Sequence, residues 1–394
     1  MKGKKLIGKI HLWLGLSSGL IVAFLGITGC ILAFQKEIES VTNQYQYVTA
    51  SDAPVLSPSV LKEKADAALP DKHAHSVAYR KPGYAVQVSY YSLGADYYYI
   101  VYLDPYTGSV QKVKNMNDDF FRIVIMGHYY LWLPPEIGQP IVASATLIFV
   151  IMLITGIILW WPKNKAARKQ RFSVKWSAKW KRVNYDLHNV LGFYATWVAL
   201  FIALTGLVMG FQWFAKSVYW TASGGKQMVE FYEPVHAVGT AASTPAIDRV
   251  WHKIMAERKN AAIIDVHVPQ NDSTAIEVAV NPDAGTYYKA DYLYFNQYTL
   301  EEIPVTHVYG KYSEASAADK LARMNYDLHV GAYWGLPGKM LAFFASLIAG
   351  SLPITGFMIW WGRKKKKKLQ PTVGLQHEAG LMQTKVSRIP EVMQ

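Results

Sequence analysis

The chain has 394 residues, of which 51% are hydrophobic, and a formal net charge of +13. Its single cysteine, Cys30, excludes a disulfide framework and any zinc or iron–sulfur centre built on several cysteines. The positive charge predicts no nucleic-acid partner, because it is concentrated in residues 2–9, 163–182 and 363–368 and not on one folded surface.

Four stretches of the chain are almost free of charged residues, and they are 12–34, 141–161, 190–214 and 340–361. Each has about the 20 residues that cross a bilayer core of roughly 30 Å, so membrane lipid is an expected partner. The positive-inside rule places the three basic segments, and with them both termini, in the cytoplasm. A basic start before an apolar run is also typical of a signal peptide. We expect a span, because the same segment recurs inside the chain.

These features predict eight segments along the chain. They are a cytoplasmic N-terminus with the first span (1–35), a first outer module (36–120), an outer segment with the second span (121–162), a basic cytoplasmic loop (163–183), the third span (184–214), a second outer module (215–322), an outer segment with the fourth span (323–362) and a basic cytoplasmic tail (363–394).

The two long polar stretches look like small α+β modules. In the first, 56–69 is expected to be helical and 76–113 alternates as strands do, with a turn signal at 104–108. In the second, a helix is predicted at 247–258. Its expected strands are 263–268, 275–280 and 287–295. Both modules are rich in tyrosine, which is typical of strands and equally suits a docking surface.

An internal repeat relates the two halves of the chain. When His11 is set over His188, Thr28-Gly29 falls on Thr205-Gly206. When His128 is set against His329, Thr155-Gly156 answers Thr355-Gly356 with one residue of slip. Span, module and span are therefore followed by span, module and span. The fold class expected is an all-α membrane four-helix bundle of two parallel tandem repeats, carrying two α+β outer modules.

Four histidines stand at equivalent membrane edges of the four predicted spans. His11 and His188 open the first and third spans from the cytoplasmic side, and His128 and His329 precede the second and fourth on the outer side. The repeat places the members of each pair at equal depth. Two histidines that face each other across a bundle are what a bis-histidine haem requires, so we predict an inner and an outer pair as iron ligands.

Two further patterns accompany the histidines. Small residues follow His11 and His188 at helical spacing, which leaves room for a macrocycle and equally permits close helix packing. A basic residue stands six positions before each histidine, and Arg122 and Arg323 on the outer side are candidates to pair with haem propionates. His128 is too far from Trp161 for one helical span, at about 50 Å. Breaks at Pro134-Pro135 and Pro140, and at Pro337-Gly338, therefore predict short outer segments folded over the bundle mouth.

These motifs resemble those of the PepSY-associated transmembrane proteins. The resemblance is carried by Ile10–Gly15, by Asp186-Leu187-His188, by Asp327-Leu328-His329 and by the Thr-Gly-x3-Trp-Trp endings at 155–161 and 355–361. The turn at 104–108 is similar to the close of a PepSY module. The match extends over nearly the whole chain, although the second module lacks this turn sequence.

The resemblance implies a bacterial inner-membrane protein with periplasmic modules and two haem b groups. It also implies transfer of electrons from a cytoplasmic reductase or quinol to a periplasmic ferric siderophore, which makes the protein a ferric-siderophore reductase. One alternative is a cytochrome b that serves a quinone or a partner protein. Another is a protein without redox chemistry whose modules bind peptides. No flavin, nicotinamide or nucleophile motif is visible, and the residues that bind the substrate are not identified by the sequence.

Overall fold

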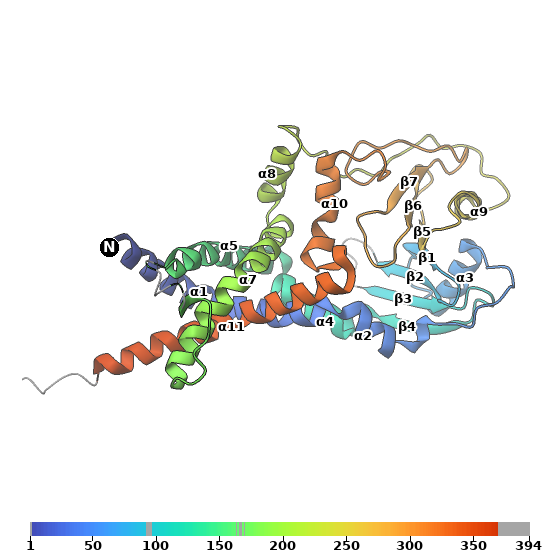
Figure 1. Ribbon diagram of the computed structural model, residues 1–394. Coiled ribbons are helices and arrows are strands. Elements are labelled where there is room, and N and C mark those ends of the chain that lie inside the picture. Colours follow the sequence, from blue (N-terminus) through green and yellow to red (C-terminus); the bar gives the residue numbers. More distant parts are fainter. Residues whose placement is uncertain (1, 92–96, 163, 165–167, 169, 369–394) are drawn as a thin grey trace, which may run out of the picture.

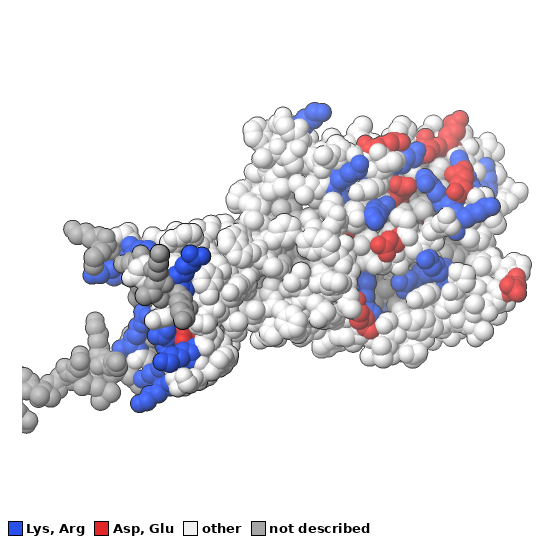
Figure 2. Space-filling view, in the orientation of Figure 1, with Lys and Arg blue, Asp and Glu red and all other residues white. Residues whose placement is uncertain are grey.

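The computed structural model describes residues 2–91, 97–162, 164, 168 and 170–368. Its four longest helices are α1 (Lys2–Ala33), α5 (Pro135–Trp160), α7 (Trp180–Gly210) and α11 (Gly335–Lys368). All four are long and apolar enough to cross a membrane, as predicted. They run side by side at one end of the molecule (Figure 1). A band almost without charged side chains separates the basic end of this bundle from the outer domain (Figure 2).

The bundle places large residues outward and small residues inward. Trp13 and Leu20 on α1 are exposed, whereas Ala195, Ala199 and Ala203 on α7 are buried. This distribution is typical of membrane helices, whose interfaces are made by small residues that let backbones approach. α1 packs against α5 and α11, and α7 packs against the same two helices from the other side.

A seven-stranded antiparallel sheet forms the outer domain, in the order β4-β3-β2-β1-β5-β6-β7. The strands are β1 (Ser76–Arg80), β2 (Val86–Tyr91), β3 (Tyr98–Leu103), β4 (Val110–Asn115), β5 (Ile263–His267), β6 (Ile276–Asn281) and β7 (Asp291–Phe295). β1 of the first polar stretch pairs with β5 of the second, in a register that puts Ser76 opposite His267. The two predicted modules therefore share one sheet. Each contributes an edge strand that would otherwise be unpaired.

Two helices cover the face of the sheet that lies away from the bundle (Figure 1). They are α3 (Pro58–Ala68) and α9 (Ala246–Glu257), close to the predicted helices at 56–69 and 247–258. Leu61, Trp251 and Val266 are buried in the core between these helices and the sheet. The alternation of the strands turns the remaining residues, among them Tyr98, Ile100 and Tyr102, toward the bundle side.

Short helices connect the bundle to the sheet. They are α2 (Gln35–Thr42), α4 (Phe120–Tyr130), α8 (Gln212–Ala222), α10 (Ala317–His329) and the 3-10 turns η1 (Gln44–Gln46), η2 (Met116–Asp118) and η3 (Ala332–Trp334). α4 ends at Tyr130, the next residue Leu131 has a φ of 55°, and α5 begins at Pro135, so the expected break before the second span is confirmed. No break occurs at Pro140, which lies inside α5. In the second half the break falls at Gly331, with a φ of 75°, and α11 runs through Pro337-Gly338. Residues 369–394 of the predicted tail lie outside the described residues.

Candidate functional site: four histidines in the bundle

The outer histidines face each other at the mouth of the bundle. His128 lies in the last turn of α4, and His329 is the last residue of α10. Their ring centres are 6.3 Å apart and the rings are inclined by 66°. Two imidazoles on opposite sides of one iron, with bonds of about 2 Å, have ring centres roughly 6 Å apart. The predicted outer pair is thus brought together with a separation that fits a shared metal ion.

A cavity of about 1330 Å³, counting space open to the surroundings, contains both outer histidines. Its other walls are small residues from all four long helices, including Gly26, Gly29, Ala143, Ala203, Gly206 and Ala345. A cavity of this size, apolar along its walls and with two imidazoles in it, suits a flat hydrophobic ligand. The small residues that follow His11 and His188 in sequence therefore serve the outer cavity as well as helix packing.

Each of the four histidines contacts the threonine of a Thr-Gly pair on a neighbouring helix. His11 Nδ1 lies 2.9 Å from Thr155 Oγ1, and His188 Nδ1 lies 2.9 Å from Thr355 Oγ1. In the outer pair, His128 Nδ1 lies 2.8 Å from Thr28 Oγ1, and His329 Nδ1 lies 3.0 Å from Thr205 Oγ1. One arrangement is therefore repeated four times.

The hydrogen bonds of the threonines determine which ring nitrogen carries the proton. Each hydroxyl has one hydrogen and donates it within its own helix, as Thr155 does to Ile151 O at 2.8 Å and Thr28 does to Phe24 O at 2.9 Å. Toward histidine the hydroxyl is then an acceptor, so Nδ1 carries the proton. His329 Nδ1 also lies 3.0 Å from the carbonyl of Ile202, which can only accept. The network assigns the free lone pair to Nε2, the form in which imidazole binds a metal.

The glycine after each threonine leaves room for the ring. A Cβ added to Gly356 would lie 3.2 Å from His188 Cε1, and one added to Gly206 would lie 3.3 Å from His329 Cε1. The corresponding distances are 3.5 Å for Gly156 to His11 and 3.7 Å for Gly29 to His128. Sequence reasoning used the Thr-Gly pairs to align the repeat and as part of the family motif, and gave them no role beside the histidines. Their fourfold recurrence on the faces opposite four histidines was the signal that they hold the rings.

The inner histidines have different surroundings. Their rings lie near the N-terminal ends of α1 and α7 and are held from α5 and α11. The methyl group of Met152 packs on Gly15, and Leu352 packs on Gly192. Methionine is a flexible side chain that fills irregular gaps and moves at low cost. His11 and His188 therefore occupy equivalent positions. Met152 and Leu352 fill the space one helical turn after them.

The two predicted arginines occupy related but unequal positions. The guanidinium of Arg122 lies over the ring of Tyr98 in β3 at 5.3 Å, and that of Arg323 lies over Tyr292 in β7 at 5.4 Å. Arg323 is buried and donates to the carbonyls of Gly310, at 3.1 Å, and of Ala290. Arg122 lines a second cavity outside the outer histidines. Only Arg122 therefore reaches a space beside the candidate site.

Carboxylates fix the segments that carry the histidines. Asp327 is fully buried and accepts hydrogen bonds from the backbone N–H groups of Tyr287 and Tyr288, at 2.9 and 2.8 Å. Burial raises the pKa of Asp327, although these bonds oppose the effect. Asp186 accepts from Arg182 Nε at 2.8 Å within α7 and from the backbone N–H of Lys175, before that helix, at 3.3 Å. Each Asp-Leu-His motif thus bonds its helix to another segment two residues before the histidine.

The other histidines that the structure describes form no further candidate centre. Among the described residues, no three His, Cys, Asp or Glu side chains are placed to hold a metal ion. The Cys30 thiol donates to the carbonyl of Phe343 at 3.3 Å. The histidine pairs, each two imidazoles and no third ligand, suit an iron whose other ligands come from a macrocycle.

The bundle, the outer sheet and the paired histidines define a multi-pass membrane protein with a candidate cofactor site between its helices. The chain matches the family model described as the PepSY-associated TM region over residues 9–363, and it belongs to that family. No curated protein matches the chain.

Proposed function

We propose that this protein is a di-haem b electron carrier that reduces ferric siderophores on the outer side of the bacterial inner membrane. The observation that carries the proposal is the fourfold His–Thr–Gly arrangement, with the outer rings 6.3 Å apart across a cavity. Haem, when bound, supplies the one-electron chemistry. His128 and His329 would hold the outer group, and His11 and His188 the inner one.

The protein's own residues position and isolate these two sites. Thr28, Thr155, Thr205 and Thr355 orient the rings, because a ring whose Nδ1–H is bonded cannot rotate freely. Large lipid-facing side chains and small inward ones keep water away from the bundle interior. A low dielectric favours electron transfer between fixed sites over loss to the solvent.

Charge supports the orientation in the proposal. Lys and Arg gather at the bundle end that lies away from the sheet, and acidic and basic residues mix on the outer domain (Figure 2). The positive-inside rule then puts the sheet in the periplasm and both termini in the cytoplasm. Electrons would enter near His11 and His188 from a cytoplasmic reductase or quinol and leave near His128 and His329.

Spectroscopy of the purified protein tests the proposal. Protein expressed with ample haem should show a Soret band and, after dithionite, a b-type reduced spectrum with two haems per chain. Re-oxidation by a ferric siderophore, with an Fe(II) trap present, should proceed in proportion to the siderophore added. A colourless protein would refute haem binding and favour a peptide-binding role. A haem protein re-oxidised by a quinone but not by ferric siderophores would refute the acceptor alone.

A further inference from the structure

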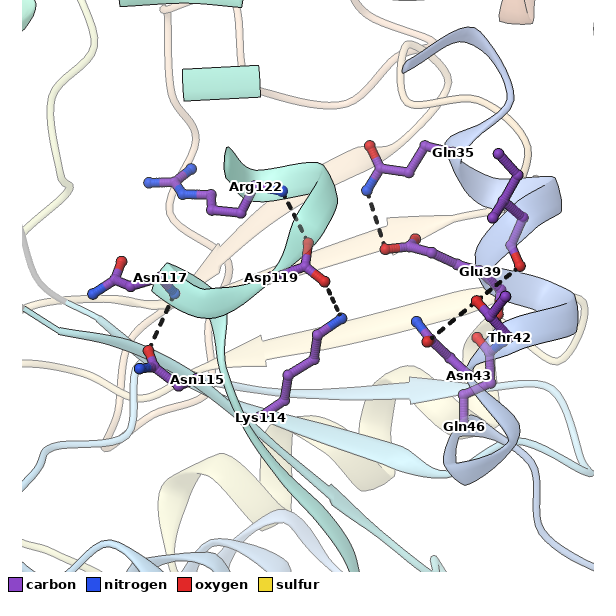
Figure 3. Close-up of polar contacts among 11 residues, drawn as sticks. Gln35, Glu39, Thr42, Asn43, Gln46, Lys114, Asn115, Asn117, Asp119 and Arg122 are labelled. Carbon is purple, nitrogen blue, oxygen red and sulfur yellow. Dashed lines mark hydrogen bonds and ion pairs between the residues drawn. The ribbon is translucent and has the colours of Figure 1, made fainter. Parts of the chain in front are cut away.

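A second cavity lies immediately outside the outer histidines, between the bundle and the sheet. It has a volume of about 940 Å³, counting space open to the surroundings. Leu32, Gln35, Ile125, Tyr326 and Val330 line both this chamber and the cavity of His128 and His329, so the two spaces adjoin. α2 and α4 approach the chamber from two sides, and Figure 3 shows Gln35, Glu39, Asp119 and Arg122 on its walls.

The acidic groups of the chamber already have partners. Asp119 accepts from Lys114 Nζ at 2.7 Å, and Glu39 accepts from Gln35 Nε2 at 3.3 Å (Figure 3). Lys339 is paired with Glu37, whose two carboxylate oxygens lie 2.6 and 2.9 Å from its Nζ. Lys36 and Arg122 are the other two cations that line the chamber.

Lys36 and Arg122 contact neutral groups. Lys36 Nζ donates to the carbonyls of Ala284 and Gly285, at 3.1 and 3.5 Å, and lies 4.3 Å from the centre of the Tyr287 ring. The Arg122 side chain extends away from Asp119 in Figure 3 and lies over Tyr98. In the described part of the chain, neither cation is within ion-pair distance of a carboxylate. Burial lowers the pKa of Lys36, although the more distant carboxylates of Asp327, Asp283 and Glu37 oppose the effect.

The second half of the molecule has no equivalent arrangement at Arg323. The guanidinium there is enclosed by Tyr292 and Tyr312, at 5.4 and 5.3 Å, and bonded to two carbonyls. Its donors are used within the fold. Arg122 lines the chamber and lies over Tyr98, with no such bonds to carbonyls among the described contacts, so its side-chain donors can serve a ligand.

We propose that this chamber binds carboxylate groups beside the outer histidine pair, through Arg122 and Lys36. The inference rests on the proposed function, since the nearest source of carboxylates is the propionates of a haem held by His128 and His329. An acceptor that carries carboxylates is the other source of the same chemistry. Arg122 presents a planar fork that suits a carboxylate, and Lys36 adds a second charge.

Four variants of the full-length protein test the chamber: Arg122→Gln, Lys36→Gln, the double variant, and Lys259→Gln. Lys259 lies in an exposed turn after α9 and provides the same charge change elsewhere. The first readout is the rate at which haem passes to apomyoglobin, measured with haem and with its dimethyl ester. The second is the KM for a carboxylate-bearing ferric chelate, ferric citrate, and for an uncharged one.

If the propionates are the ligand, the double variant should lose haem about tenfold faster, and the dimethyl ester should abolish the difference. If the acceptor is the ligand, haem loss should not change, and KM should rise about tenfold for ferric citrate alone. Equal behaviour of the double variant and Lys259→Gln in both assays would overturn the proposal. A wild type that takes up no haem would refute the proposed function instead. In that case, calorimetry would measure whether the chamber binds citrate. Binding by the wild type that is lost in the double variant would support the carboxylate site, and no binding by the wild type would overturn it.

Discussion

The two halves of this protein hold their histidines in the same way but differ in what surrounds them. In both halves a histidine on one helix meets a Thr-Gly pair on the next. The first half, however, has Gly26 where α1 meets α11 and an open chamber at Arg122. The second half has Ala203 at the position that corresponds to Gly26, and its Arg323 is enclosed. The His–Thr-Gly contact, which both halves share, holds the histidine rings. The chamber at Arg122, which the second half lacks at Arg323, leaves the site of His128 and His329 open on one side.

The largest expected effect concerns Gly26, whose position in the third span is taken by Ala203. A Cβ on Gly26 would lie 2.7 Å from both the Cα of Gly350 and the carbonyl oxygen of Ser346, which are backbone atoms. Gly26→Ala should therefore force α1 away from α11 and destabilise the bundle by about 1–3 kcal/mol. Thermal unfolding in detergent measures this. Ala203→Gly is the matched change in the other half and should cost clearly less; equal losses would contradict the asymmetry of packing.

A smaller difference is expected between Thr28 and Thr205. For His128 Nδ1 the described contacts give Thr28 alone, whereas His329 Nδ1 also bonds the carbonyl of Ile202. Thr28→Val removes the hydrogen-bond acceptor of the His128 ring, so haem should be retained about tenfold more weakly. Thr205→Val should have less effect. Haem-transfer rates give both values. Thr221→Val, whose hydroxyl bonds the carbonyl of Ser217 within α8, is the control and should behave as wild type.

The smallest effect concerns a carboxyl of the second half. Burial, with Asp265 and Glu233 nearby, raises the pKa of Glu277 to about 7. From about pH 4.5 to 7 the folded protein then binds a proton that the unfolded chain lacks, so stability falls as pH rises through this window. Glu277→Gln should remove this dependence and stabilise the sheet at pH 8 by about 1 kcal/mol relative to pH 5, because solvent screens the partly exposed carboxylate.

Thermal unfolding of the outer domain at the two pH values is the measurement. Glu257→Gln, an exposed change at the end of α9, is its control. β1 and β2 of the first half carry no carboxylate, so these strands should contribute no such pH dependence. An unchanged pH profile in Glu277→Gln would show that the ionisation of Glu277 is not shifted by folding.

The elements that follow from local pattern could be predicted from the sequence. The four spans, α3, α9 and most strands come from apolar runs and alternation, which need no distant partner. The depth of His128 and His329 followed from the repeat. The pairing of β1 with β5 could not be predicted, because nearly 190 residues separate Ser76 from His267, and either strand satisfies the pattern of a separate module.

The same limit applies to the site. The histidines were found because an ionisable residue is rare in a span and four recur in register. The contact of the threonines with the histidine rings was not predicted, because Thr-Gly is also an ordinary helix-packing pair. Only the geometry shows the threonine hydroxyl beside Nδ1 of the histidine. Arg122 and Arg323 have identical spacing from their histidines. What separates them is the 290–316 segment that encloses Arg323, which the spacing does not reveal.

The haem content of double histidine variants tests whether the four histidines form an inner and an outer pair. Each variant would be purified after expression with ample haem and its haem counted per chain. We expect one haem in His11→Ala with His188→Ala, one haem in His128→Ala with His329→Ala, and none in His11→Ala with His128→Ala. Each pair of substitutions removes two histidines, so only the pairing distinguishes them. Equal haem content in all three would contradict an inner and an outer site built from the two halves.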